Sequence, residues 1–152
     1  AAAMSHLALS ITNAAFVTSN NVERAYETYE LADATLGGGT IKFESDPDSA
    51  ACDTLVFSGD TRIGFSPAAP LKLRLSSPVS YTKRHDYEVM VFPAGVRTLR
   101  SEDFDILGIA FDQVENGGKY AICARVSSDG AGCQHVYVVR LSTIPGTVLS
   151  VR

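Results

Sequence analysis

Short apolar runs rich in Val, Ile, Phe and Tyr recur along this chain about every 8 to 15 residues, separated by clusters of Gly, Pro, Asn, Asp and Ser. Such runs fit pleated strands, because β-branched and aromatic side chains pack well on a half-buried sheet. Leu71, Leu73 and Leu75 alternate with Lys72 and Arg74 and form the clearest half-buried strand. We therefore expect an all-β fold, an antiparallel β-sandwich or barrel, in a single domain over residues 1–152.

Three turn signals predict hairpins between neighbouring strands. They are Ser58-Gly59-Asp60, Glu115-Asn116-Gly117-Gly118 and Ser128-Asp129-Gly130. The first joins strands expected at residues 55–57 and 62–65, and the second joins strands at 106–111 and 119–126. Alternation along the expected strands predicts a core of Phe57, Leu73, Leu75, Val89, Ile109, Ile122, Val136 and Val138.

One segment departs from the strand pattern. Apolar residues at 22, 25, 26 and 29 have helical spacing, with Asn20 or Asn21 as the cap and Gly37 as the stop. They predict one short helix near residues 21–34, which would make the domain mainly β. The alternative is a strand with Val22, Arg24, Tyr26 and Thr28 on one face.

Composition excludes several classes of protein. With 45% hydrophobic and 20% charged residues the chain should fold, and its formal charge of -4 argues against nucleic-acid packaging. No apolar run approaches the roughly 20 residues that span a bilayer. The opening AAAMSHLALSIT lacks the pattern of a signal peptide, so we expect no membrane partner and assign no compartment from targeting signals.

Three cysteines, Cys52, Cys123 and Cys133, allow at most one disulfide within the chain. A turn centred at residues 129–130 would place Cys133 opposite Val126, a register that does not favour a bridge to Cys123. We expect buried, reduced thiols that act as small hydrophobic groups.

Side chains capable of chemistry are scattered along the sequence. The histidines, His6, His85 and His135, do not form a metal-ligand cluster, and Asp46, Asp48 and Asp53 lack the spacing of a calcium loop. Glu102, Asp103 and Asp105 have the pattern of carboxylates in an exposed loop, and Gly37-Gly38-Gly39 precedes a strand instead of a phosphate-binding helix. We therefore predict no catalytic residue, no cofactor and no metal site.

Four tyrosines are candidate platforms for a sugar ring: Tyr26, Tyr29, Tyr81 and Tyr87. The chain has no Trp, which weakens a lectin interpretation. The basic segment Lys83-Arg84-His85 is interpreted as a solvated turn or a contact for an acidic partner.

The segment Val96–Val126 combines Ser101-Glu102-Asp103-Phe104-Asp105, the run Ile106–Phe111, Asn116-Gly117-Gly118 and an alternating strand. In this order the segment resembles part of the small β-rich phage head-decoration, or capsid-cement, proteins. The resemblance implies a non-enzymatic protein of the virion that binds outside a capsid, and it carries over no catalytic residue.

Together these features predict a structural or assembly protein that acts through subunit–subunit contacts, as a homo-oligomer or in a larger assembly. The expected contact regions are the loops Glu44–Asp53 and Tyr81–Asp86 and the terminal segments. The alternative is a ligand-binding β-sandwich module for carbohydrate or a protein partner. A third hypothesis is an enzyme whose site forms only in three dimensions.

Overall fold

The computed structural model describes residues 2–11, 15–18, 25–76, 85–107 and 120–142, with side chains except at 2–8, 120–121 and 140–142. Nearly all regular structure in these residues is β, and the one helical element among them is a 3-10 turn, η1 (Ser101–Asp103). The prediction of a mainly β fold is confirmed.

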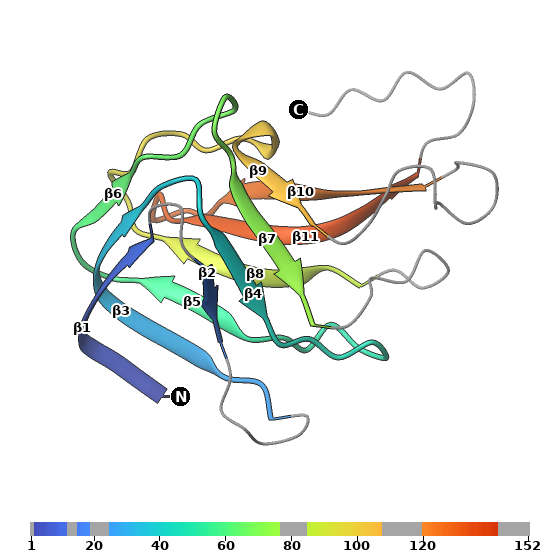
Figure 1. The fold of residues 1–152 in the computed structure, drawn as a ribbon, viewed down its shortest axis with the longest axis horizontal. Helices are drawn as coiled ribbons and strands as arrows, with labels where there is room; N and C mark the ends of the chain where they lie inside the picture. Colours follow the sequence, from blue (N-terminus) through green and yellow to red (C-terminus); the bar gives the residue numbers. More distant parts are fainter. Residues whose placement is uncertain (1, 12–14, 19–24, 77–84, 108–119, 143–152) are drawn as a thin grey trace.

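The strands form two sheets that face each other across the core (Figure 1). Sheet A has the order β1-β3-β5-β8-β11-β10, with β6 also paired to β3, and sheet B has the order β2-β4-β7-β9. The strands are β1 (Ala2–Ile11), β2 (Ala15–Val17), β3 (Thr28–Leu36), β4 (Thr40–Phe43), β5 (Thr54–Phe57), β6 (Thr61–Ile63), β7 (Leu71–Leu75), β8 (Tyr87–Phe92), β9 (Phe104–Ile106), β10 (Tyr120–Ser128) and β11 (Gln134–Ser142).

The prediction of antiparallel sheets is wrong for most of the described strands. Every pair in sheet B is parallel, and so are the pairs joining β1, β3, β5, β6 and β8 in sheet A. Phe16 pairs with Ile41 about 25 residues on, and Leu55 pairs with Met90 about 35 residues on. Connections of this length allow a crossover. Strands that follow each other in sequence therefore lie in different sheets, except for the pairs β5–β6 and β10–β11, which lie in sheet A.

The chain therefore winds as a stack of coils. It passes from sheet A to sheet B and back: β1 leads to β2, β3 to β4, β5 and β6 to β7, and β8 to β9. This arrangement is a short parallel β-solenoid. Apolar side chains of successive coils align inside it, as in the row Phe16, Ile41, Leu73 and Ile106 of sheet B.

The expected hairpin at Ser58-Gly59-Asp60 is absent from the described structure. Instead, β5 and β6 both run parallel to β3 and pair with its two halves, before and after this segment. Gly59 packs so close to the backbone of Ala32 that a Cβ would overlap the Ala32 carbonyl oxygen. The segment Ser58-Gly59-Asp60 therefore interrupts one coil between β5 and β6 and does not form a hairpin turn. Gly fits here because it lets the backbone approach the neighbouring strand closely.

The predicted helix near residues 21–34 is also wrong where the structure describes it. Residues 25–27 have no regular structure and residues 28–34 belong to β3, while 21–24 lie outside the described residues. β3 pairs with β1 on one edge and with β5 and β6 on the other. Pairing on both edges, with Leu31 and Leu36 buried in the core, outweighs the helical spacing.

The last described strands form the one predicted hairpin that the structure tests and confirms. β10 pairs antiparallel with β11, but Val126 lies opposite Val136 and not opposite Cys133, which belongs to the turn. All three cysteines are free and half-buried. Of the predicted core, Leu75 is only partly buried and Ile109 lies outside the described residues, whereas six residues are buried: Phe57, Leu73, Val89, Ile122, Val136 and Val138.

Candidate interaction surfaces

The first coil leaves the stack open at one end. β1 and β2 are the terminal strands of their sheets, and no strand in the described part of the chain pairs with their outer edges. Val17 of β2 is 55% exposed and is the one large hydrophobic side chain exposed among the described residues. An edge of this kind presents unpaired backbone N–H and C=O groups and can accept another strand.

The opposite end of the stack is covered differently. β10, the terminal strand of sheet A there, packs against η1 and β9. The Ser101 hydroxyl donates a hydrogen bond of 2.6 Å to the Ala124 carbonyl of β10. The buried Gln134 side chain accepts from the Leu99 N–H at 2.7 Å and donates to the Arg97 carbonyl at 2.9 Å. These bonds fix the final hairpin to the preceding coil.

Asp103 is the centre of that attachment and not a solvated loop carboxylate as predicted. It is fully buried, and its two oxygens accept 3.0 Å hydrogen bonds from the Arg97 guanidinium. The Arg100 backbone N–H donates a third bond at 2.8 Å. Burial alone would raise the pKa of Asp103, but these bonds and the nearby positive charges bring it below the ordinary value. Asp103 therefore serves as an ionised anchor.

The loop at residues 44–53, here called the acidic turn, is one of the predicted contact regions. It contains four carboxylates and no Lys or Arg. Asp46 shapes it, because the Asp46 carboxylate accepts hydrogen bonds from the Asp48 N–H at 2.9 Å and the Ser49 hydroxyl at 3.1 Å. Asp48 is exposed at its tip.

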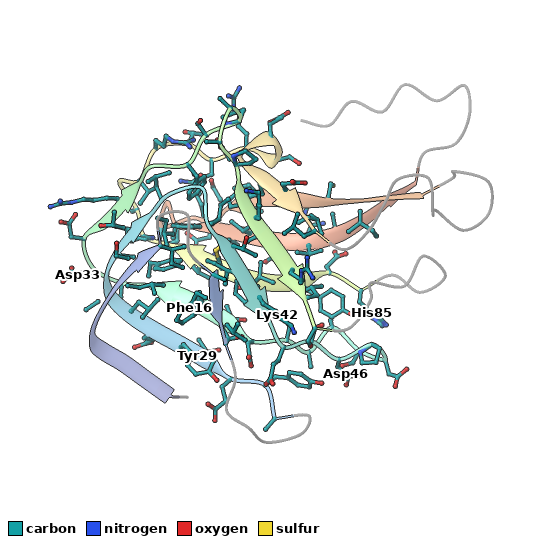
Figure 2. All side chains as sticks on the ribbon, in the orientation of Figure 1. Phe16, Tyr29, Asp33, Lys42, Asp46 and His85 are labelled. Atoms are coloured by element: carbon teal, nitrogen blue, oxygen red, sulfur yellow. The ribbon has the colours of Figure 1, made fainter. Side chains whose placement is uncertain are left out.

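The structure brings the acidic turn next to the second predicted contact region. The Tyr87 hydroxyl donates a 2.7 Å hydrogen bond to the Asp46 carbonyl, and the His85 ring lies edge-on to the Tyr87 ring. Figure 2 shows Asp46 and His85 at the same end of the molecule. Residues 81–84, which complete that predicted loop, and the termini 1 and 143–152 lie outside the described residues.

Asp53 is buried and does not face solvent with the other carboxylates of the turn. It accepts hydrogen bonds from the Thr18 hydroxyl at 2.6 Å and from the Glu27 N–H at 2.9 Å. Thr18 follows β2, so Asp53 ties the first coil to the third. The expectation of solvated loop carboxylates is therefore wrong for Asp53 and holds for the exposed Asp48.

Two of the candidate sugar platforms are inside the protein. Tyr29 is 8% exposed and Tyr87 is 1% exposed, so neither ring face is open to a ligand. Tyr26 is half-buried, and Tyr81 lies outside the described residues. This arrangement removes much of the basis for the lectin interpretation.

The thiols and the best-placed histidine have environments that restrict their reactivity. Burial raises the pKa of Cys52 to about 12, with Asp53 and Glu88 adding to the effect, and burial also raises the pKa of Cys123. His135 contacts Asp129 at 2.8 Å through Nε2 and Glu88 at 3.2 Å through Nδ1. The Asp129 hydrogen bond is the main cause of the raised pKa of His135, which favours the imidazolium. With both ring nitrogens engaged, His135 is held as an ion pair.

Sheet B carries a feature that sequence reasoning missed. On its outer face, Lys42 of β4 lies in register with Arg74 of β7, and Lys72 lies two residues before Arg74. We call Lys42, Lys72 and Arg74 the basic stripe. No ion pair or side-chain hydrogen bond joins these three side chains to another residue within the described ranges. Only the parallel register, which no sequence signal indicated, brings together cations about 30 residues apart.

A shallow polar depression of about 260 Å³ lies on the other face of the molecule. It is lined by residues of β1, β3 and β6 and the segment before β6: Leu9, Ser10, Asp33, Ala34, Thr35, Asp60 and Arg62. Arg62 contacts Asp60 at 3.4 Å, and both side chains are largely exposed. The depression has no aromatic wall.

Family models and curated proteins offer no relative from which a role could be transferred. No family model matches the sequence, and no curated protein matches it. The described residues contain no group of three or more His, Cys, Asp or Glu side chains placed to hold a metal ion. No helix in the described ranges is long and apolar enough to cross a membrane.

Proposed function

We propose that this protein is a non-enzymatic assembly protein that works by associating with further copies of itself. The observation that carries the proposal is the open first coil, where β1 and β2 end their sheets without a described partner. Solenoid proteins require terminal caps because an uncapped coil exposes both backbone groups and core. Pairing with another subunit would satisfy the same groups.

The chemistry of the candidate reactive groups supports a role without turnover. Cys52 is protonated at neutral pH because its pKa is about 12, and protonated thiols are poor nucleophiles. Asp103 is occupied by Arg97, and His135 is held between two carboxylates. Each of these groups therefore has a structural partner.

The platform for such an assembly would be the outer surface of a capsid, in keeping with the resemblance of residues 96–126 to head-decoration proteins. A chain with a net charge of -4 lacks the surplus of cations that binding to a nucleic-acid genome requires, so a protein surface is the better partner. The carbohydrate-binding alternative is less favoured, because Tyr29 and Tyr87 are buried and the polar depression offers no ring for stacking.

Light scattering coupled to size exclusion over a range of concentrations tests self-association through the open end. Ser10→Lys with Val17→Lys places a charge on each edge strand at exposed side chains, and edge lysines oppose strand pairing. We expect this variant to be monomeric at concentrations where the wild-type chain is associated. Ala68→Lys, in the exposed turn between β6 and β7, is the control for an added surface lysine and should behave as wild type.

A wild-type chain that stays monomeric at every concentration would overturn the proposal. So would a Ser10→Lys, Val17→Lys variant that associates as strongly as the Ala68→Lys control, because the edges would then not form the contact.

A further inference from the structure

The basic stripe and the acidic turn point to a second, lateral contact between copies. We propose that the basic stripe of one copy docks on the acidic turn of another in a two-fold arrangement. This inference rests on the proposed self-assembly and names a second surface, which adjoins the open end at Val17.

The basic stripe carries an electrostatic cost. Lys42 and Arg74 occupy directly opposed positions on neighbouring strands, and like charges in such positions repel. The sheet leaves them without a carboxylate partner among the described side chains, although acidic residues outnumber basic ones in the whole chain, 17 to 13. A partner that supplies negative charge would remove the repulsion.

The outer face of sheet B also presents apolar surface beside the basic stripe. Val17 of β2 is in register with Lys42, so the row across three strands reads Val17, Lys42 and Arg74. An exposed apolar side chain beside cations that have no carboxylate partner among the described residues suits a protein partner, because part of the contact area would be buried away from water.

The acidic turn lies next to the basic stripe. β4 runs directly from Lys42 into the turn, and the Ser45 N–H donates a 2.9 Å hydrogen bond to the Ser76 hydroxyl just after β7. Both strands of the stripe therefore end at the turn. Figure 2 shows Lys42 and Asp46 on this part of the molecule.

Adjacent patches of opposite charge are self-complementary under two-fold symmetry. If an axis passes between them, the basic stripe of each copy faces the acidic turn of the other, and both contacts form at once. The turn is rigid enough to act as a docking element, because Asp46 shapes it from within and Tyr87 holds its backbone. The occupant of the stripe is therefore a second copy of this chain.

Charge reversal provides the test, with association measured by sedimentation velocity at low salt. Lys42→Glu with Arg74→Glu makes the stripe acidic, and Asp48→Lys with Ala50→Lys replaces the negative charge at the exposed tip of the turn by two positive charges while keeping Asp46. All four side chains are exposed, so each variant should fold. Each double variant on its own should associate at least tenfold more weakly than the wild-type chain, because like charges then meet at both contacts. An equimolar mixture should restore it, because each variant supplies the charge that the other lacks.

The single variant Lys42→Glu should also weaken association. Its matched control is Arg62→Glu, since this variant makes the same change in net charge at an exposed position on the other face. It should leave association unchanged. Raising the salt from about 0.05 to about 0.5 M should weaken the wild-type contact by screening.

Each result has a distinct meaning. If Lys42→Glu matches Arg62→Glu, or if the mixed variants do not associate although circular dichroism shows them folded, the lateral contact is wrong. Loss of association in the Ser10→Lys, Val17→Lys variant would then leave the proposed function standing. A monomeric wild-type chain would overturn both proposals, whereas disruption by charge reversal alone would support the lateral contact and contradict the open-end contact.

Discussion

Asp103 joins segments that are far apart in sequence. Arg97, which it binds, also donates a 2.7 Å hydrogen bond to the Phe65 carbonyl and lies over the Phe65 ring. The pair thus connects the segment before β7 to the segment before β9. A carboxylate with this role is indistinguishable in sequence from its exposed neighbours Glu102 and Asp105, because only the fold determines which one turns inward.

We expect Asp103→Asn to lower the free energy of unfolding by roughly 2 to 4 kcal/mol. Loss of one partner in a buried pair costs about 3 to 5 kcal/mol, and the partial exposure of Arg97 reduces that cost. Urea denaturation measures the change. Asp60→Asn breaks an exposed Asp–Arg pair and should cost under about 0.5 kcal/mol; equal losses in both variants would contradict the anchoring role.

His135 should make stability depend on pH. Because its pKa is raised in the folded state, its contribution is complete below the ordinary value of 6.5 and is lost as pH rises through the folded value. Glu88 and Asp129 are the carboxylates that face it. We expect His135→Gln to reduce stability more at about pH 5.5 than at about pH 9. Thermal unfolding at the two pH values tests this, and a stability difference that grows with pH would contradict it.

At the scale of the element, the break at Gly59 separates β5 from β6, which pair with the two halves of β3. Gly59→Ala should destabilise the protein by about 1 to 3 kcal/mol or more, because its Cβ would overlap the Ala32 carbonyl and force the backbone apart. Gly130 has no atom within 4 Å of a built Cβ, so Gly130→Ala is the control and should change stability by less than about 1 kcal/mol. Similar unfolding midpoints for both variants would rule out the close approach.

The internal row of sheet B predicts a second effect at this scale. Leu73 is fully buried between Ile41 and Ile106 of the neighbouring coils. Leu73→Ala should cost about 2 to 5 kcal/mol because it leaves a cavity in the row. Arg74→Ala, on the outer face of the same strand, should change stability by no more than about 0.5 kcal/mol. A denaturant titration that ranks the two the other way would reverse the assigned faces of β7.

Much of the element level could be predicted from the sequence, because alternation depends on local burial. The positions of β4, β7 and β8 and six buried core residues follow from it. Half-buried strands of parallel and antiparallel sheets can show the same local alternation. Alternation therefore gives no information on which strand pairs with which. Coils of unequal length, about 25 to 35 residues, also hide the repeat that would indicate a solenoid.

At the scale of the whole molecule, the contact regions could be predicted only in part. The acidic turn was expected as a polar loop, since Glu44 to Asp53 is rich in Asp and Ser. The basic stripe could not be expected, because Lys42 and Arg74 become neighbours only through the register of β4 and β7. The open end likewise depends on the order of strands in the two sheets, which residue types do not encode.

The covered end also determines how the chain can fold. The β10–β11 hairpin pairs residues as close as Ser128 and Gln134, so it can form within about 1 to 10 μs, whereas every parallel pair must first close a long loop. We expect the hairpin to offer β11 as a template for β8, and the coils to be added in the reverse of their order in the sequence. Pulse-labelled hydrogen exchange should show amides of β10 and β11 protected first and those of β1 and β2 last; early protection of β1 and β2 would reverse this order. The surface proposed for assembly would then be the last part of the protein to mature.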